Sequence, residues 1–208
     1  MDAQKKDQDK KRPRLPPSLK DIVYIAVISN PAPGKSSNFE VYAITMSAFS
    51  IIKLKYSRKT RLSPGMVIDL RDFGEMSHYT IEDDIPFDKI AERDRNFIGK
   101  ALVSAGEKHP IGLLKAQTMA EEGIENLFRL LNMNDPERLA VFLKGVQESS
   151  FEGEVTHRDL FAIFIRAFSG AKKPPDVRQQ EALISICGNN PAVIIELAEA
   201  YLDYAGKN

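Results

Sequence analysis

Hydrophobic and polar residues alternate in short segments through residues 20–85, and this pattern predicts β-strands. β-Branched and aromatic residues dominate the segments, and turn-forming residues separate them. In the third segment Ile52 and Leu54 alternate with Lys53 and Lys55, which predicts a strand with one apolar and one basic face. The expected strands are Ile22–Ile28, Phe39–Met46, Phe49–Tyr56, Met66–Leu70 and a more weakly marked His78–Ile81.

From Pro86 onward the apolar residues recur with the period of an α-helix, about 3.6 residues. Six helices are predicted, and some begin at clear capping signals, such as Thr156 with Asp159 three residues later. The fourth helix is apolar almost all round, which predicts a central position in the helical half. The six helices occupy about 87–105, Pro110 to about Leu131, Asn134 or Asp135 to beyond Val146, Thr156 to Phe168, Asp176 to Cys187, and Pro191 to about Tyr204.

The order and lengths of the expected strands resemble those of an OB-fold, a small, five-stranded, partly closed barrel. The residues that carry this resemblance are the apolar first strand ending in Pro31-Ala32-Pro33, the next two strands, and Leu62–Leu70. An SH3-like or other small barrel is the alternative. The predicted fold class is segregated α+β, with a five-stranded OB-like β-barrel at residues 20–85 and an all-α six-helix bundle or short helical solenoid at residues 86–206.

Charge is balanced over the whole chain, with 29 basic and 29 acidic residues, but the front of the chain is positive. Residues 1–19 have no periodic apolar pattern and are predicted to be a disordered basic tail. Within this tail a short basic cluster beside a proline resembles a nuclear-import signal; a solubilising tail or a nucleic-acid arm are the alternatives. The cluster consists of Lys10, Lys11, Arg12 and Arg14.

The strongest candidate for function is the basic third strand together with the turn after it. OB-folds bind single strands through Lys and Arg contacts to phosphates and through stacking of bases on aromatic rings. The alternative is that these charges keep an exposed strand soluble and discourage edge pairing. The candidate nucleic-acid-binding residues are Lys53, Lys55, Tyr56, Arg58, Lys59 and Arg61, with Tyr24 and Tyr42 as stacking partners.

Residue types that support catalysis or metal binding lack the spacing that such sites need. Glu82-Asp83-Asp84 is interpreted as an acidic connector, and Gly34-Lys35-Ser36 precedes a strand where a phosphate-binding loop would precede a helix. The single cysteine, Cys187, ends an apolar helical pattern and is expected to be a core residue. No metal-ligand spacing joins the three histidines, which are His78, His109 and His157. No catalytic residue, metal or cofactor is expected.

These observations predict a non-enzymatic adaptor or subunit of a nuclear or nucleoprotein complex. The helical half is expected to bind a protein partner, and the barrel is the candidate for binding single-stranded DNA or RNA. The alternative is a pure protein–protein interaction scaffold with no nucleic-acid contact. No apolar run is long enough to cross a bilayer and the N-terminus is polar, so neither membrane insertion nor secretion is expected. The predicted location is intracellular, and nuclear rather than cytoplasmic. No small-molecule substrate is expected.

Overall fold

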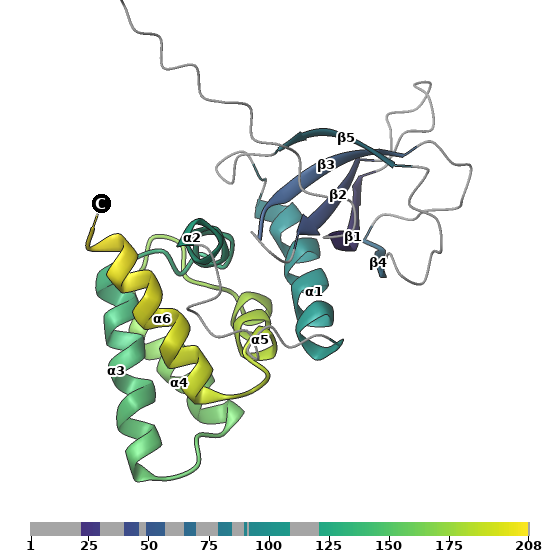
Figure 1. Cartoon of the computed structure of the whole chain (residues 1–208). Coiled ribbons are helices and arrows are strands. Elements are labelled where there is room, and N and C mark those ends of the chain that lie inside the picture. Colours follow the sequence, from purple (N-terminus) through teal and green to yellow (C-terminus); the bar gives the residue numbers. More distant parts are fainter. Residues whose placement is uncertain are drawn as a thin grey trace, which may run out of the picture.

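In the part of the chain that it describes, the structure combines an antiparallel sheet with six helices, shown in Figure 1. The computed structural model describes residues 22–29, 40–45, 49–56, 65–69, 79–84, 90, 92–108 and 121–207. The strands are β1 (Ile22–Ser29), β2 (Glu40–Thr45), β3 (Ile51–Tyr56), β4 (Val67–Asp69) and β5 (Tyr79–Asp84). Each lies within, or overlaps, a segment in which the alternating pattern predicts a strand.

The sheet is open, so the prediction of an OB-like β-barrel is wrong. The strand order is β4-β1-β2-β3-β5, and every neighbouring pair is antiparallel. Closing the sheet would require its two edge strands, β4 and β5, to pair with each other, and no such pairing exists among the described residues. β4 is only three residues long and pairs with β1 alone. The alternation of residues indicates where strands form but carries no information on whether their edges meet.

One face of the sheet is covered by a helix, and not by further strands as in a closed barrel. The helix α1 (Glu92–Lys108) packs against β1, β2 and β4. The hydroxyl of Tyr24 on β1 donates to the carbonyl of Ser104 on α1 at 3.3 Å, and Lys108 Nζ lies 3.7 Å from the Asp69 carboxylate on β4. The apolar face of the sheet is therefore buried against a helix, as one-sided antiparallel sheets require.

The remaining five helices follow the predicted order. They are α2 (Glu121–Leu130), α3 (Pro136–Glu152), α4 (His157–Phe168), α5 (Val177–Ile186) and α6 (Pro191–Ala205). The capping signals are confirmed: Thr156 and Asp159 form a capping box at α4, and Asp176 and Gln179 form one at α5. The prediction that the second helix begins near Pro110 falls partly outside the described residues. Among these residues, no helix is long and apolar enough to cross a membrane.

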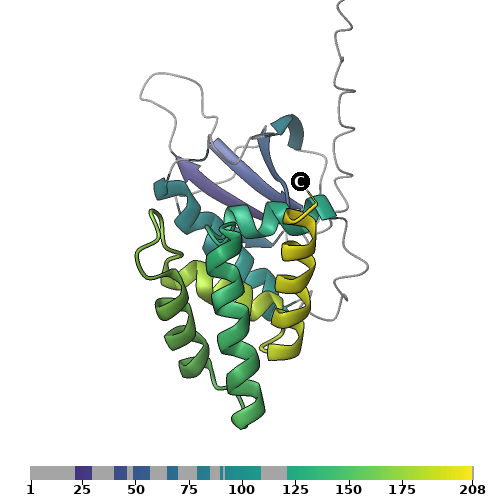
Figure 2. The same ribbon diagram turned by 90° about the vertical axis from the view of Figure 1, so that its left-hand side faces the viewer.

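The centre of the helical half is α3, not α4 as the apolar sequence of α4 predicts. Figure 2 shows α3 between α4 and α6, and both helices contact it. Phe142 of α3 stacks on Phe164 of α4 with ring centroids 4.2 Å apart, whereas Ile165 on the opposite side of α4 is 69% exposed. An apolar helix need not be surrounded, because isolated exposed apolar residues are common on protein surfaces.

One hydrophobic core runs from the sheet to the C-terminal helix, and α1 and α5 join its two parts. The core includes Tyr24 of β1, Leu102 of α1, Leu183 of α5 and Tyr201 of α6. Cys187 is fully buried in it, as expected, and burial raises the pKa of its thiol. In Figure 1 α5 lies between α1 and the bundle of α3, α4 and α6.

The contact between α1 and α5 depends on a glycine. A Cβ atom added at Gly106 would lie 2.5 Å from the carbonyl carbon of Ser185 and 2.6 Å from the amide nitrogen of Ile186. These are backbone atoms that no side-chain rotation can move aside. Gly106 therefore sets how closely the two helices approach.

We expect Gly106→Val to lower the free energy of unfolding by about 3 kcal/mol, because the added side chain forces α1 and α5 apart. Urea denaturation followed by circular dichroism measures this change. The matched control on the same helix is Gly99→Ala, whose Cβ meets the nearest atom at an ordinary 3.5 Å. The control should be neutral or stabilising by up to about 1 kcal/mol. Equal stability of the two variants would contradict the close approach at Gly106.

Candidate functional site

The structure places the predicted nucleic-acid surface beside an acidic strand. Lys53 and Lys55 lie on β3, and Lys53 pairs across the sheet with Asp83 of β5. The acidic cluster Glu82–Asp84 thus belongs to the neighbouring strand, whereas the sequence suggested that it was a separate connector. The register therefore places a basic residue of β3 opposite an acidic residue of β5. Tyr56 also lies on β3, while Arg58, Lys59 and Arg61 lie outside the described residues.

The two tyrosines proposed for base stacking belong to the core region. Tyr24 is 1% exposed and its hydroxyl is bonded to Ser104, so its ring is a packing contact. Tyr42 is half-buried and packs against the core. The tail cluster of Lys10, Lys11, Arg12 and Arg14 lies outside the described residues, and so do His78 and His109. His157 is the first residue of α4, and its Nε2 lies 2.9 Å from Asn189 Oδ1.

A different concentration of positive charge lies in the helical half, in a surface pocket of about 380 Å³ that we call the basic pocket. Four cationic side chains line it: Arg95 from α1, Arg129 from the end of α2, and Lys172 and Lys173 from the connection between α4 and α5. The other lining residues are Asn132, Asn134, Asp135, Phe168 and Ala171. The walls thus come from three separate stretches of the chain.

Local sequence explains why each cation is where it is. Arg129 lies in the last turn of α2, where a positive charge is favoured by the helix dipole. Lys172 and Lys173 precede Pro174-Pro175, which cannot continue a helix and restrict the backbone before them to extended conformations. The Gln180 side-chain amide donates to the Pro175 carbonyl at 2.9 Å and fixes the end of this connection.

A buried hydrogen-bond chain behind the basic pocket holds its walls together. Arg95 Nη1 donates to Asn132 Oδ1 at 2.5 Å, and Asn132 Nδ2 donates to Gln179 Oε1 at 3.2 Å. Gln179 is 3% exposed, and its amide donates to the Leu130 carbonyl at 3.1 Å. Asn132 has a left-handed φ of 57°, which Asn tolerates better than most residues. The chain connects α1, the turn after α2 and the start of α5.

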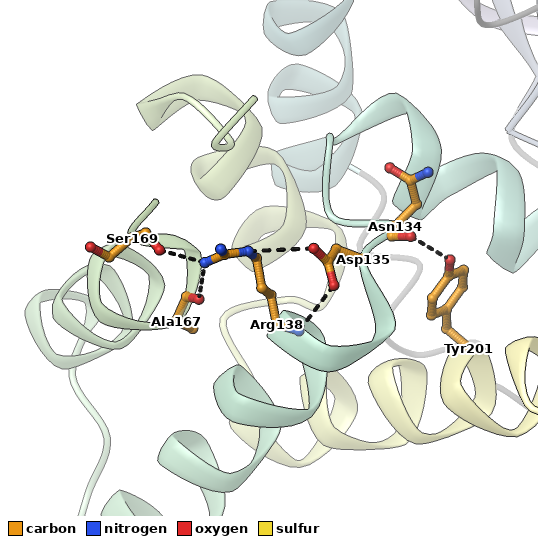
Figure 3. A network of polar contacts seen from close by, with 6 residues as sticks. All are labelled: Asn134, Asp135, Arg138, Ala167, Ser169 and Tyr201. Carbon is orange, nitrogen blue, oxygen red and sulfur yellow. Dashed lines mark hydrogen bonds and ion pairs between the residues drawn. The ribbon is translucent and has the colours of Figure 1, made fainter. Parts of the chain in front are cut away.

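Figure 3 shows a second network on the far side of that turn. The Asp135 carboxylate caps α3 by accepting from the Arg138 amide at 3.2 Å, and it lies 3.4 Å from Arg138 Nε. Arg138 also donates to the carbonyls of Ala167 and Ser169 at the end of α4. Tyr201 donates to the Asn134 carbonyl at 3.0 Å, and its pKa is raised, mainly by burial. The negative charge of Asp135 is therefore engaged by Arg138.

The basic pocket can bind an oxyanion. Guanidinium and ammonium groups supply strong, charge-assisted hydrogen bonds, and Asn side chains add neutral donors. Sequence reasoning missed this site because Lys172 and Lys173 look like part of a linker. Nothing in the one-dimensional pattern indicates that Arg95 and Arg129 come close to them. Among the described residues no group of three or more His, Cys, Asp or Glu side chains could hold a metal ion.

The chain matches no known protein-family model, no curated protein sequence and no solved structure. The OB-fold resemblance therefore finds no support in such matches either.

The buried chain behind the basic pocket should be important for stability. We expect Gln179→Met, which keeps the volume but removes the amide, to lower the free energy of unfolding by about 2 kcal/mol. The Leu130 carbonyl, the Asn132 side-chain amide and the Asp176 backbone amide at the cap of α5 all lose their partner. Gln147→Met is the control, since Gln147 bonds only to Glu199 at the surface. It should change stability by less than about 0.5 kcal/mol. Chemical denaturation of both variants makes the comparison, and equal losses would refute a special role of Gln179.

Proposed function

We propose that this protein is a non-enzymatic adaptor or subunit of a larger assembly and that its helical half holds an anionic segment of a protein partner in the basic pocket. The observation that carries the proposal is the convergence of Arg95, Arg129, Lys172 and Lys173 on one 380 Å³ pocket. The one carboxylate among its described lining residues, that of Asp135, is engaged by Arg138. No carboxylate of the described residues lies within ion-pair distance of Arg95, Lys172 or Lys173, whereas Arg129 is paired with Glu125. The charge of the first three favours an anionic ligand.

The chemistry of the lining residues suits binding more than proton transfer. Guanidinium groups stay charged at physiological pH, and their planar forks match the oxygens of carboxylates and phosphates. Such groups recognise an anion and hold it in a defined orientation. Arg95 is oriented before any ligand arrives, because Asn132 accepts its hydrogen bond at 2.5 Å, and this lowers the entropic cost of binding.

The proposal assigns no nucleic-acid contact to the sheet. The barrel on which that contact depended does not form, Tyr24 is buried, and Lys53 pairs with Asp83. The alternative inferred from sequence, a scaffold for protein–protein interaction, agrees better with a basic pocket in the helical half.

Binding of anionic peptides tests this proposal directly. Fluorescent dodecapeptides with random flanks and either glutamate or phosphoserine at the centre are titrated against the full chain at low and moderate salt. We expect the native protein to bind this anionic pool, with lower affinity at higher salt because the contacts are ionic. The neutralised variant R129Q/K172Q/K173Q should lose at least about tenfold in affinity, equivalent to about 1.4 kcal/mol.

The matched control is K144Q/R158Q/K207Q, which removes three exposed cations outside the basic pocket. Lys144 and Lys207 form surface ion pairs, which contribute little to stability. The control should therefore fold normally and bind like the native protein. Failure of the native protein to bind the anionic pool, or equal losses in the two triple variants, would overturn the proposal.

We also propose a nuclear location, which is supported by the basic cluster of the tail. A fluorescent-protein fusion of the full chain should concentrate in the nucleus of a eukaryotic cell, and K10A/K11A/R12A/R14A should abolish that enrichment. K5A/K6A, which removes two lysines from the same tail, is the control. Unchanged enrichment after the fourfold substitution would refute the import role of the cluster.

A further inference from the structure

We propose that the anion recognised by the basic pocket is a phosphorylated serine or threonine side chain of the partner. This inference rests on the proposed function and goes beyond it, since acidic and phosphorylated segments are different ligands.

The charge of the basic pocket exceeds what a single carboxylate can neutralise. In the described part of the chain, no carboxylate lies within ion-pair distance of Arg95, Lys172 or Lys173, whereas Arg129 forms an ion pair with Glu125 at 3.5 Å. Glu125 is shared, because its other oxygen accepts from the Tyr204 hydroxyl at 2.9 Å. A phosphorylated side chain carries close to two negative charges near neutral pH, and it matches this surplus better than glutamate does.

The cations that line the basic pocket come from three stretches of the chain. Arg95 comes from α1, Arg129 from the end of α2, and Lys172 and Lys173 from the connection after α4. A phosphoryl group has three strongly accepting terminal oxygens, one more than a carboxylate, and carries more charge. It can therefore form more charge-assisted hydrogen bonds with this set of donors. The volume, about 380 Å³, has room for the phosphorylated side chain and part of its flanking backbone.

The floor of the basic pocket disfavours nucleic acid as the source of the phosphate. Single-strand binders combine a basic track with aromatic rings on which bases stack. Phe168 is the aromatic residue in the described lining, and it is 2% exposed, with its ring centroid 6.4 Å from that of Phe164 in the core. No face of this ring is open to a base. A phosphorylated peptide needs no such platform.

The test compares three peptide pools that differ at one position. Dodecapeptides with random flanks carry phosphoserine, glutamate or serine at the centre, and each pool is titrated against the full chain. We expect the phosphoserine pool to bind at least about tenfold more tightly than the glutamate pool, and the serine pool to bind weakest. The variant R129Q/K172Q/K173Q should remove this preference, whereas K144Q/R158Q/K207Q should keep it.

The outcomes separate this inference from the proposed function. Equal affinity for the phosphoserine and glutamate pools, both lost in the pocket variant, would overturn phosphate recognition and leave anionic-peptide binding intact. Absence of binding to either pool would overturn both. Labelled oligo(dT) and ATP serve as competing probes. If either one binds more tightly than the phosphoserine pool, and this binding is also lost in R129Q/K172Q/K173Q, the ligand is a nucleic acid or a free nucleotide. That outcome would refute a phosphopeptide ligand.

Discussion

The close packing of α1 on α5 at Gly106 is the constraint on which the rest of the structure depends. α1 covers the sheet on one side and contacts α5 on another, so it is the element through which the strands and the helical bundle share one core. If α1 moved away from α5, the sheet would lose its connection to the bundle. Arg95, on the first turns of the same helix, would leave the basic pocket. Stability and the proposed binding site thus share one contact.

The basic pocket illustrates how a buried polar network can serve an exposed site. Gln179 bonds to the Leu130 carbonyl and, through Asn132, holds Arg95, so a residue with 3% exposure orients a cation at the surface. Asp135 is directed by Arg138 into capping α3. The hydrogen-bond chain therefore holds Arg95 in place, and the carboxylate of Asp135 is already paired with Arg138. An arrangement of this kind prepares a site for an anion before the anion binds.

Because the sheet is open and not a closed barrel, the candidate functional site lies elsewhere in the molecule. In a closed barrel, a basic third strand would form an outer binding surface. In the open sheet, β3 lies between β2 and β5, and the register places Lys53 opposite Asp83. The helical half, for which sequence predicted only a general protein contact, contains four cationic side chains around one pocket. Both proposals follow from the position of these cations in the helical half.

The sequence by itself determined the local elements: strands where residues alternate, helices where apolar residues recur every three to four positions, and caps such as Thr156 and Asp176. These features depend on neighbours within a few residues, which the sequence displays directly. Only the tertiary structure decided that the sheet stays open, that α3 is central, and that Arg95 and Arg129 meet Lys172 and Lys173. Such contacts join residues far apart along the chain, and their formation depends on how all the elements pack together, which no local pattern encodes.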